Sequence, residues 1–399
     1  MREHFHVPRT ADGEEIYFVG NSLGLMPKRV ADAVQVELEK WRTMGVRGHF
    51  GGDFPWVSYH EPLAPLMASL VGASVDEVVM MNTLTVNLHL MMATFYRPTK
   101  SRFKILIEDH AFPSDQYAVD SQVRWHGWEP QQAVIRLTPD QGQLFSTERI
   151  CQTIEDQAAT LALVLLPGVQ YYTGQVLDMA AITETAHRFE IPVGFDLAHA
   201  AGNIPLQLHD WQVDFAVWCT YKYLNSGPGS IAGCFVHRNH ATNTQLDRLA
   251  GWWGHHKESR FLMGDCFQPI PTAEGWQLSN PPILSLAAIR ASLEVFHTAG
   301  GMERLRKKSV AMNVFFRECL ADVLGSAVQV IAPHNQSGCQ LSLEMNFPGV
   351  SGKAIHQRLE EAGIRTDWRE PNVIRAAPVP LYNSFTEIWR FVKTLEQCV

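Results

Sequence analysis

Short apolar runs alternate with helical patterns between about residue 75 and residue 240, and this alternation limits the folds open to the chain. Strands that are apolar throughout and separated by helices are typical of a mostly parallel sheet with helices on both faces. The pattern therefore predicts an α/β fold. The six runs predicted to be buried strands are VVMM (78–81), KILIE (104–108), LALVLL (161–166), IPVGFD (191–196), DFAVWC (214–219) and IAGCFVH (231–237).

The two ends of the chain have a different texture. An amphipathic helix is predicted after Pro27, and its apolar face would hold Val30, Val34, Leu38 and Trp41. A helical stripe follows residue 283, then a predicted strand at 339–347 and a last helix bearing Ile388, Phe391, Val392 and Leu395. We expect a large domain of residues 45–285 and a smaller α+β domain of residues 1–44 plus 286–399.

Composition excludes several classes of function. The net charge is −8 and no run of Lys and Arg exceeds three residues, which argues against binding to nucleic acid or an anionic membrane. The longest apolar run, 161–166, is too short to span a bilayer, and the N-terminal residues contain no signal-peptide core. Seven cysteines without a CxxC pair predict a reduced, cytoplasmic setting. Without HxxxH or HExxH, we expect no metal site.

One aspartate and one lysine follow successive apolar runs in the middle of the chain. Asp196 ends one run and Lys222 closely follows the next, in WCTYKYLNSGPG. Pyridoxal phosphate needs a carboxylate against its ring nitrogen and an amine that can bond to its aldehyde. The apolar neighbours of Lys222 should favour its neutral, nucleophilic form. Taken alone, Asp196 with His199 also fits a helix N-cap or part of a metal site, and Lys222 a solvated strand end.

Two other segments have the chemistry of an anion site. Thr85, in MNTLTVNLHL, lies at the predicted start of a helix, where a hydroxyl and free N–H groups bind phosphate well, although an ordinary N-cap fits equally. FPSD (112–115) follows the strand KILIE, and its alternative is a simple turn with an exposed aromatic ring. Gly227, Gly229 and Gly233 suggest that backbone approaches something closely. GxGxxG, GxxxxGK[ST] and GxSxG do not occur where a dinucleotide, a P-loop or a hydrolase elbow would need them.

Taken together, these motifs resemble kynureninases, pyridoxal-phosphate enzymes of the aspartate-aminotransferase-type fold (fold type I). The combination of NSLGL, TVNLHL, FPSD and YKYLN is specific to that family. The similar segments cover nearly the whole chain: YFVGNSLGLMP (17–27), MNTLTVNLHL (81–90), AFPSDQYA (111–118), GVQYYTGQ (168–175), GFDLAHAAGN (194–203), DFAVWCTYKYLN (214–225), SNPPILSL (279–286) and APVPLYNSF (377–385).

The resemblance implies a role for each of several residues. Lys222 would bond to pyridoxal 5'-phosphate, Asp196 would pair with the ring nitrogen, and Tyr221 would donate a proton during catalysis. Asn280 would reach in from a second subunit, so a homodimer with shared active sites is expected. The other implied cofactor contacts are Leu84, Thr85, Phe112, Pro113, Ser114, Asp115, His199, Trp252 and Asn280. The implied substrate contacts are Ser22, His49, Asn280 and Arg375, the last as a clamp for the α-carboxylate.

The activity that the resemblance implies is hydrolysis of L-kynurenine to anthranilate and L-alanine, in tryptophan degradation or pyridine nucleotide synthesis. Because His49, Ser279 and Asn280 could meet a ring hydroxyl, we hypothesise that 3-hydroxykynurenine is accepted too. The alternative is that His49 simply hydrogen-bonds the aryl ketone or amine. Two alternatives remain. A cysteine desulfurase of the same fold needs a reactive cysteine on a mobile loop, and Cys339, in a predicted strand, suits that role poorly. A pyridoxal-phosphate-binding regulator needs a basic DNA-binding segment, which we do not find.

Overall fold

A computed structural model describes residues 1–398, and its larger sheet has seven strands. The order of the strands is β4-β10-β9-β8-β7-β5-β6. β10 runs antiparallel to both of its neighbours, and the other pairings in this sheet are parallel. The strands are β4 (Val78–Met81), β5 (Lys104–Glu108), β6 (Val134–Leu137), β7 (Leu161–Pro167), β8 (Val193–Asp196), β9 (Phe215–Trp218) and β10 (Ala232–Val236).

All six predicted strands are confirmed, and β6 is the strand that the pattern missed. It forms one edge of the sheet, and its run VIRL is interrupted by Arg136. The guanidinium of Arg136 donates to Asp120 on the neighbouring helix at 2.7 Å, so a charged side chain is accommodated on this edge strand. An edge strand needs no continuous apolar run because it is not enclosed on both sides.

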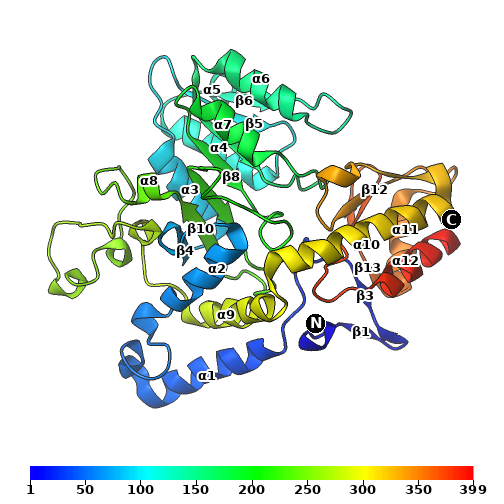
Figure 1. Cartoon of the computed structure of the whole chain (residues 1–399), viewed down its shortest axis with the longest axis horizontal. Coiled ribbons are helices and arrows are strands. Elements are labelled where there is room, and N and C mark those ends of the chain that lie inside the picture. Colours follow the sequence, from blue (N-terminus) through cyan, green and yellow to red (C-terminus); the bar gives the residue numbers. More distant parts are fainter. Residues whose placement is uncertain (399) are drawn as a thin grey trace.

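Helices cover both faces of this sheet, as predicted. Alternate residues of the strands enter opposite cores: Leu106 and Val164 pack on one face, and Ile105 and Leu163 on the other. The first face is covered by α2 (Ala64–Val71), α6 (Thr147–Gln157), α7 (Met179–His187) and α9 (Ile283–Thr298), and the second by α3 (Leu84–Phe95), α4 (Pro113–Trp125) and α5 (Pro130–Ala133). Helices α2, α3, α4 and α7 lie around this sheet in Figure 1. α8 (Arg238–Ala241) follows β10.

A second, antiparallel sheet of four strands lies towards the C-terminus, in the order β11-β12-β15-β14. Its strands are β11 (Val328–Val330), β12 (Leu341–Met345), β14 (Asp367–Arg369) and β15 (Val373–Ala376), and its helices are α10 (Gly301–Leu324), α11 (Gly352–Glu361) and α12 (Phe385–Gln397). β13 (Ile364–Arg365) pairs with β3 (Ile16–Tyr17), while β1 (Arg9–Thr10) and β2 (Gly13–Glu14) form a small ribbon. The predicted strand at 339–347 and the last helix are confirmed; the domain boundaries at 44/45 and 285/286 stay a prediction.

The first long helix, α1 (Arg29–Met44), lies along α9 (Figure 1). Its expected apolar face is only partly covered, because Leu38 is 36% exposed and Trp41 is 65% exposed. The inward positions are taken by an ion pair instead: Lys40 Nζ lies 3.0 Å from a Glu37 oxygen, and both residues are buried. Lys40 also donates to two backbone carbonyls of residues 53 and 54.

Two further features bear on the setting of the protein. None of the helices within residues 1–398 combines the length and the apolar character that a membrane crossing requires. Each of the seven cysteines is free, and five of them, including Cys339, are buried.

Candidate functional site

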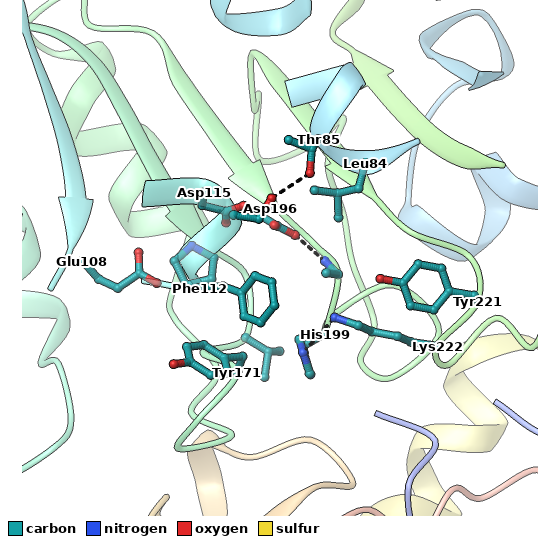
Figure 2. A pocket seen from close by; sticks show the side chains of 14 residues that line it. Leu84, Thr85, Glu108, Phe112, Asp115, Tyr171, Asp196, His199, Tyr221 and Lys222 are labelled. Atoms are coloured by element: carbon teal, nitrogen blue, oxygen red, sulfur yellow. Dashed lines mark hydrogen bonds between the residues drawn. The ribbon is translucent and has the colours of Figure 1, made fainter. Parts of the chain in front are cut away.

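A cavity opens where β5, β7 and β8 end, with Glu108, Pro167 and Asp196 at these strand ends (Figure 2). This is the edge at which parallel sheets bind their ligands. Nine of the predicted site residues line it: Leu84, Thr85, Phe112, Ser114, Asp115, Asp196, His199, Tyr221 and Lys222.

The pairing of β8 with β9 brings Asp196 and the turn that bears Lys222 into the same cavity, with Lys222 on one side of it (Figure 2). Asp196 is in register with Val217, and the chain turns after Trp218 to bring Lys222 back over the strand ends. Lys222 Nζ lies 3.0 Å from His199 Nε2 and 5.8 Å from the centroid of the Phe112 ring.

The loop at residues 20–25 fixes the turn that carries Lys222. Gly24 N donates to the carbonyl of Tyr221 at 2.8 Å, and a Cβ on Gly24 would lie 2.3 Å from the carbonyl oxygen of Lys222. Only glycine allows this approach. The close approach that we expected is confirmed at Gly233, where a Cβ would lie 2.2 Å from the Trp218 ring. At Gly227 and Gly229 a Cβ would meet no atom of the described residues within 4 Å, and their positive φ angles of 94° and 65° favour glycine.

Three carboxyl groups gather at the other side of the cavity: Asp196, Asp115 and Glu108 (Figure 2). Asp115 and Asp196 share a hydrogen bond, and Asp196 Oδ1 also accepts from Ala198 N at 2.7 Å. Burial and the charge of Asp196 raise the pKa of Asp115 well above its usual value, while burial raises the pKa of Asp196 too. Burial also raises the pKa of Glu108 to about 8.

His199 is neutral in this site. Burial, followed by the charges of Lys222 and Arg375, lowers its pKa well below the usual value. His199 Nε2 shares a hydrogen bond with the Lys222 amine, and the buried Nδ1 has no hydrogen-bond partner within residues 1–398. Burial raises the pKa of Tyr221, so its hydroxyl stays protonated at neutral pH.

Two helix N-termini meet at the remaining side of the cavity. Thr85, in the first turn of α3, and Ser114, in the first turn of α4, place their hydroxyl oxygens 2.9 Å apart (Figure 2). The N-cap alternative for Thr85 is wrong, because Thr83 is the N-cap of α3. FPSD is not a simple turn either, since Pro113 is the first residue of α4.

These groups fit pyridoxal phosphate. Two helix N-termini with two hydroxyls suit its phosphate, the Asp196 carboxylate its ring nitrogen, and the Lys222 amine its aldehyde. Two buried polar atoms, Asp115 Oδ1 and His199 Nδ1, also have no hydrogen-bond partner within the described residues. The polar ring of a bound cofactor could provide one.

Other predicted residues lie outside this cavity. Arg375 is buried on β15, behind the cavity wall. His49 ends the short helix η2 (Gly45–His49), and its ring lies edge-on to that of Trp56 with the centroids 5.3 Å apart. The remaining ones outside are Ser22 and Asn280, both exposed; Pro113, at the start of α4; and Trp252, 44% exposed in the short helix η6 (Trp252–Gly254).

Five lining residues had not been assigned to the site from the sequence: Glu108, Pro167, Val169, Tyr171 and Ala198. Glu108 carries the same signal as Asp196, a carboxylate at the end of an apolar strand. Tyr171 stands in the motif GVQYYTGQ, and its ring meets Phe112 edge-on with centroids 5.3 Å apart. The side chain of Pro167, which also lines the cavity, has no hydroxyl to offer a ligand.

Solved structures that share this fold include a protein with a bound pyridoxal-phosphate cofactor and a cysteine desulfurase. A C-DES Lys-to-Ala mutant with glycine covalently linked to the pyridoxal-phosphate cofactor matches 99% of both chains at a TM-score of 0.82 and 18% identity. The apo cysteine desulfurase from Thermococcus onnurineus NA1 matches 96% of this chain and 94% of its own, at a TM-score of 0.78 and 16% identity. The fold and the site together define a pyridoxal-phosphate-dependent enzyme of fold type I.

Comparisons of sequence give the family. The kynureninase of Myxococcus xanthus is 54% identical over 99% of this chain and 93% of its own length, and that of Koribacter versatilis is 49% identical over 98% and 93%. A model of the kynureninase C-terminal domain matches residues 305–395. The chain belongs to the kynureninase family.

Proposed function

We propose that this protein hydrolyses the Cβ–Cγ bond of L-kynurenine to give anthranilate and L-alanine. The observation that carries the proposal is the cavity in which Lys222 and Asp196 converge, in a chain about half identical to full-length kynureninases. In the overall reaction, the γ-carbon takes the hydroxyl of water and becomes the carboxyl of anthranilate, while Cβ takes a proton and becomes the methyl group of alanine.

The cofactor would be held by the groups around the cavity. Lys222 would bond to its aldehyde, Asp196 would face its ring nitrogen, and Phe112 would cover its ring. Leu84, Thr85 and Ser114, at the starts of α3 and α4, would hold its phosphate. Bound pyridoxal phosphate supplies an electron sink for the carbons next to the substrate amine.

The protein's own residues would then bind the substrate and move protons. Arg375 would hold the α-carboxylate, which fixes the Cα–H bond towards Lys222. Lys222 would be released from the cofactor when the substrate amine takes its place. Its free amine, positioned by the hydrogen bond to His199, would then take the proton from Cα. Tyr221 lines the cavity beside Lys222, and its raised pKa keeps a proton available for Cβ. The carboxyl pair Asp115–Asp196 would keep a negative charge at the ring nitrogen.

The central test uses Lys222→Ala. We expect the purified wild-type protein to be yellow and to release fluorescent anthranilate from kynurenine. The variant should lose both the yellow absorbance band and the activity, whereas Lys100→Ala, which removes an exposed lysine, should keep both. A yellow band retained in Lys222→Ala would contradict the assignment.

We also propose a homodimer with shared active sites. Asn280 and Trp252 lie outside the cavity of their own chain. Exposed apolar side chains along α1 and η2 offer a surface that a second copy would cover, with Trp41 65%, Val46 76% and Phe50 66% exposed.

Complementation between two inactive variants tests this arrangement. Lys222→Ala and Asn280→Ala, when co-expressed, should form heterodimers in which one of the two sites has both residues intact. Random pairing then restores about a quarter of the wild-type activity. No recovery in a mixture that sedimentation shows to be dimeric would mean that Asn280 does not serve the partner's site.

The substrate preference is a separate proposal. We infer that 3-hydroxykynurenine is also accepted, with its ring hydroxyl met by His49 and Asn280. His49→Ala should lower kcat/KM for 3-hydroxykynurenine more than for kynurenine, and an unchanged ratio would remove this role. We further propose a cytoplasmic location, since seven free cysteines suit a reducing compartment; activity released by osmotic shock would contradict it.

A further inference from the structure

Arg375 is held by a carboxylate on the neighbouring strand. In the register of β14 against β15, Asp367 stands directly opposite Arg375. Arg375 Nε donates to Asp367 Oδ1 at 3.2 Å and Nη2 donates to Oδ2 at 2.6 Å. Both side chains are largely buried, at 2% and 12% exposure, so this two-bond contact is shielded from water.

The same guanidinium reaches the wall of the cavity. Arg375 Nη1 donates to the carbonyl oxygen of Tyr171 at 2.6 Å, and Tyr171 lines the cavity with its ring against Phe112. Three of the five N–H groups of Arg375 are therefore bound within the chain. One N–H remains on each terminal nitrogen, and two is the number that a carboxylate needs for a two-bond contact.

The charge of this cluster also favours a carboxylate ligand. Arg369 Nη2 donates to Asp367 Oδ2 at 3.2 Å, so Asp367 lies between two guanidinium groups. Two positive charges and one negative charge leave the cluster with a net positive charge beside the cavity. The positive charge of this cluster also acts on the site. Burial and the charge of Lys222 are the larger causes of the lowered pKa of His199, and the charges of Arg375 and Arg369 lower it further.

We propose that Asp367 is a positioning residue for substrate binding: it fixes the plane of the Arg375 guanidinium so that the two remaining N–H groups meet the α-carboxylate of the substrate. The proposal rests on the role of Arg375 proposed above. Asp367 touches neither the substrate nor the reacting atoms, and its effect is confined to ligands that carry an α-carboxylate.

The test compares ligands with and without that carboxylate, using the holoenzyme. In Asp367→Asn, KM for kynurenine should rise about 10-fold or more while kcat stays within about threefold of wild type. Binding of the product L-alanine, measured by calorimetry, should weaken by a similar factor. The amine left when kynurenine loses its α-carboxyl group should inhibit variant and wild type with Ki values within about twofold.

Control variants separate the possible outcomes. Glu344→Gln removes one carboxylate from the same sheet, at a residue whose register partner is Val373, and should leave KM unchanged. Asp367→Glu, which keeps the charge, should recover part of the affinity. If Arg375→Lys leaves KM unchanged, the proposed role of Arg375 is wrong. If Arg375→Lys raises KM and Asp367→Asn does not, the role of Asp367 is refuted and that of Arg375 stands. The role of Asp367 is also refuted if Asp367→Asn raises the Ki of the decarboxylated amine as much as it raises KM for kynurenine.

Discussion

Gly24→Ala tests whether the loop at residues 20–25 sets the position of Lys222. The added Cβ would lie 2.3 Å from the Lys222 carbonyl oxygen and 2.9 Å from Asn225 Cα, whereas ordinary contacts begin at 3.4 Å. Both of these obstacles are backbone atoms, so the loop or the turn must move by about 1 Å. A displacement of that size at a catalytic group costs about 100-fold in rate. We therefore expect kcat/KM for kynurenine to fall by about two orders of magnitude.

A second glycine variant separates displacement from loss of stability. Gly127→Ala places a Cβ at a φ of 80° in open space, so it should cost about 1–2 kcal/mol of stability without moving the site. Both variants would be assayed for anthranilate release below their melting temperatures. If Gly24→Ala keeps kcat/KM within about threefold of Gly127→Ala, the loop does not fix the Lys222 turn.

Three further predictions follow from the described contacts. Thr85→Val should weaken pyridoxal-phosphate binding to the apo protein about 10-fold, while Ser121→Ala, further along α4, should not; fluorescence titration measures both. Burial raises the pKa of Glu108 from the ordinary 4.5 to about 8 in the folded apo protein. Between these two pH values the folded protein therefore binds one proton more than the unfolded chain. Its free energy of unfolding should fall as the pH rises through this range, by about 1.4 kcal/mol per pH unit. Glu108→Gln should flatten that slope in urea unfolding at pH 5 to 8, and an unchanged slope would contradict the assignment. Lys40→Met leaves Glu37 buried without its cation and should lower the free energy of unfolding by about 3 kcal/mol. Adding Glu37→Gln to this variant should restore part of that stability. An unchanged free energy of unfolding in Lys40→Met would mean that the pair is not buried in solution.

The strands of the large sheet could be predicted because burial on both faces leaves a continuous apolar run. The same reasoning fails where burial is incomplete. β6, at an edge, carries Arg136, and α1 turns Glu37 and Lys40 inward while Trp41 stays exposed. A hydrophobic stripe cannot distinguish a face that packs within the chain from one that is left open for another molecule.

The site could be predicted where the chemistry is local. Asp196, Lys222 and Thr85 each lie at the end of a strand or the start of a helix, so their place at one sheet edge follows from the topology. The two bonds between Asp367 and Arg375 depend on strand register in the second sheet, and no local pattern gives that register. Glu108 carried the right signal and was overlooked.

The register between β8 and β9 has a consequence for how such enzymes can vary. Asp196 and the turn that bears Lys222 are fixed by neighbouring main chains, which lie about 4.8 Å apart in any sheet. The number of residues that joins the two strands does not enter this separation. Insertions and deletions between His199 and the start of β9 can therefore accumulate without altering the distance between carboxylate and amine. A fixed count between such residues is a poor criterion for finding distant relatives, whereas their positions at adjoining strand ends are a good one.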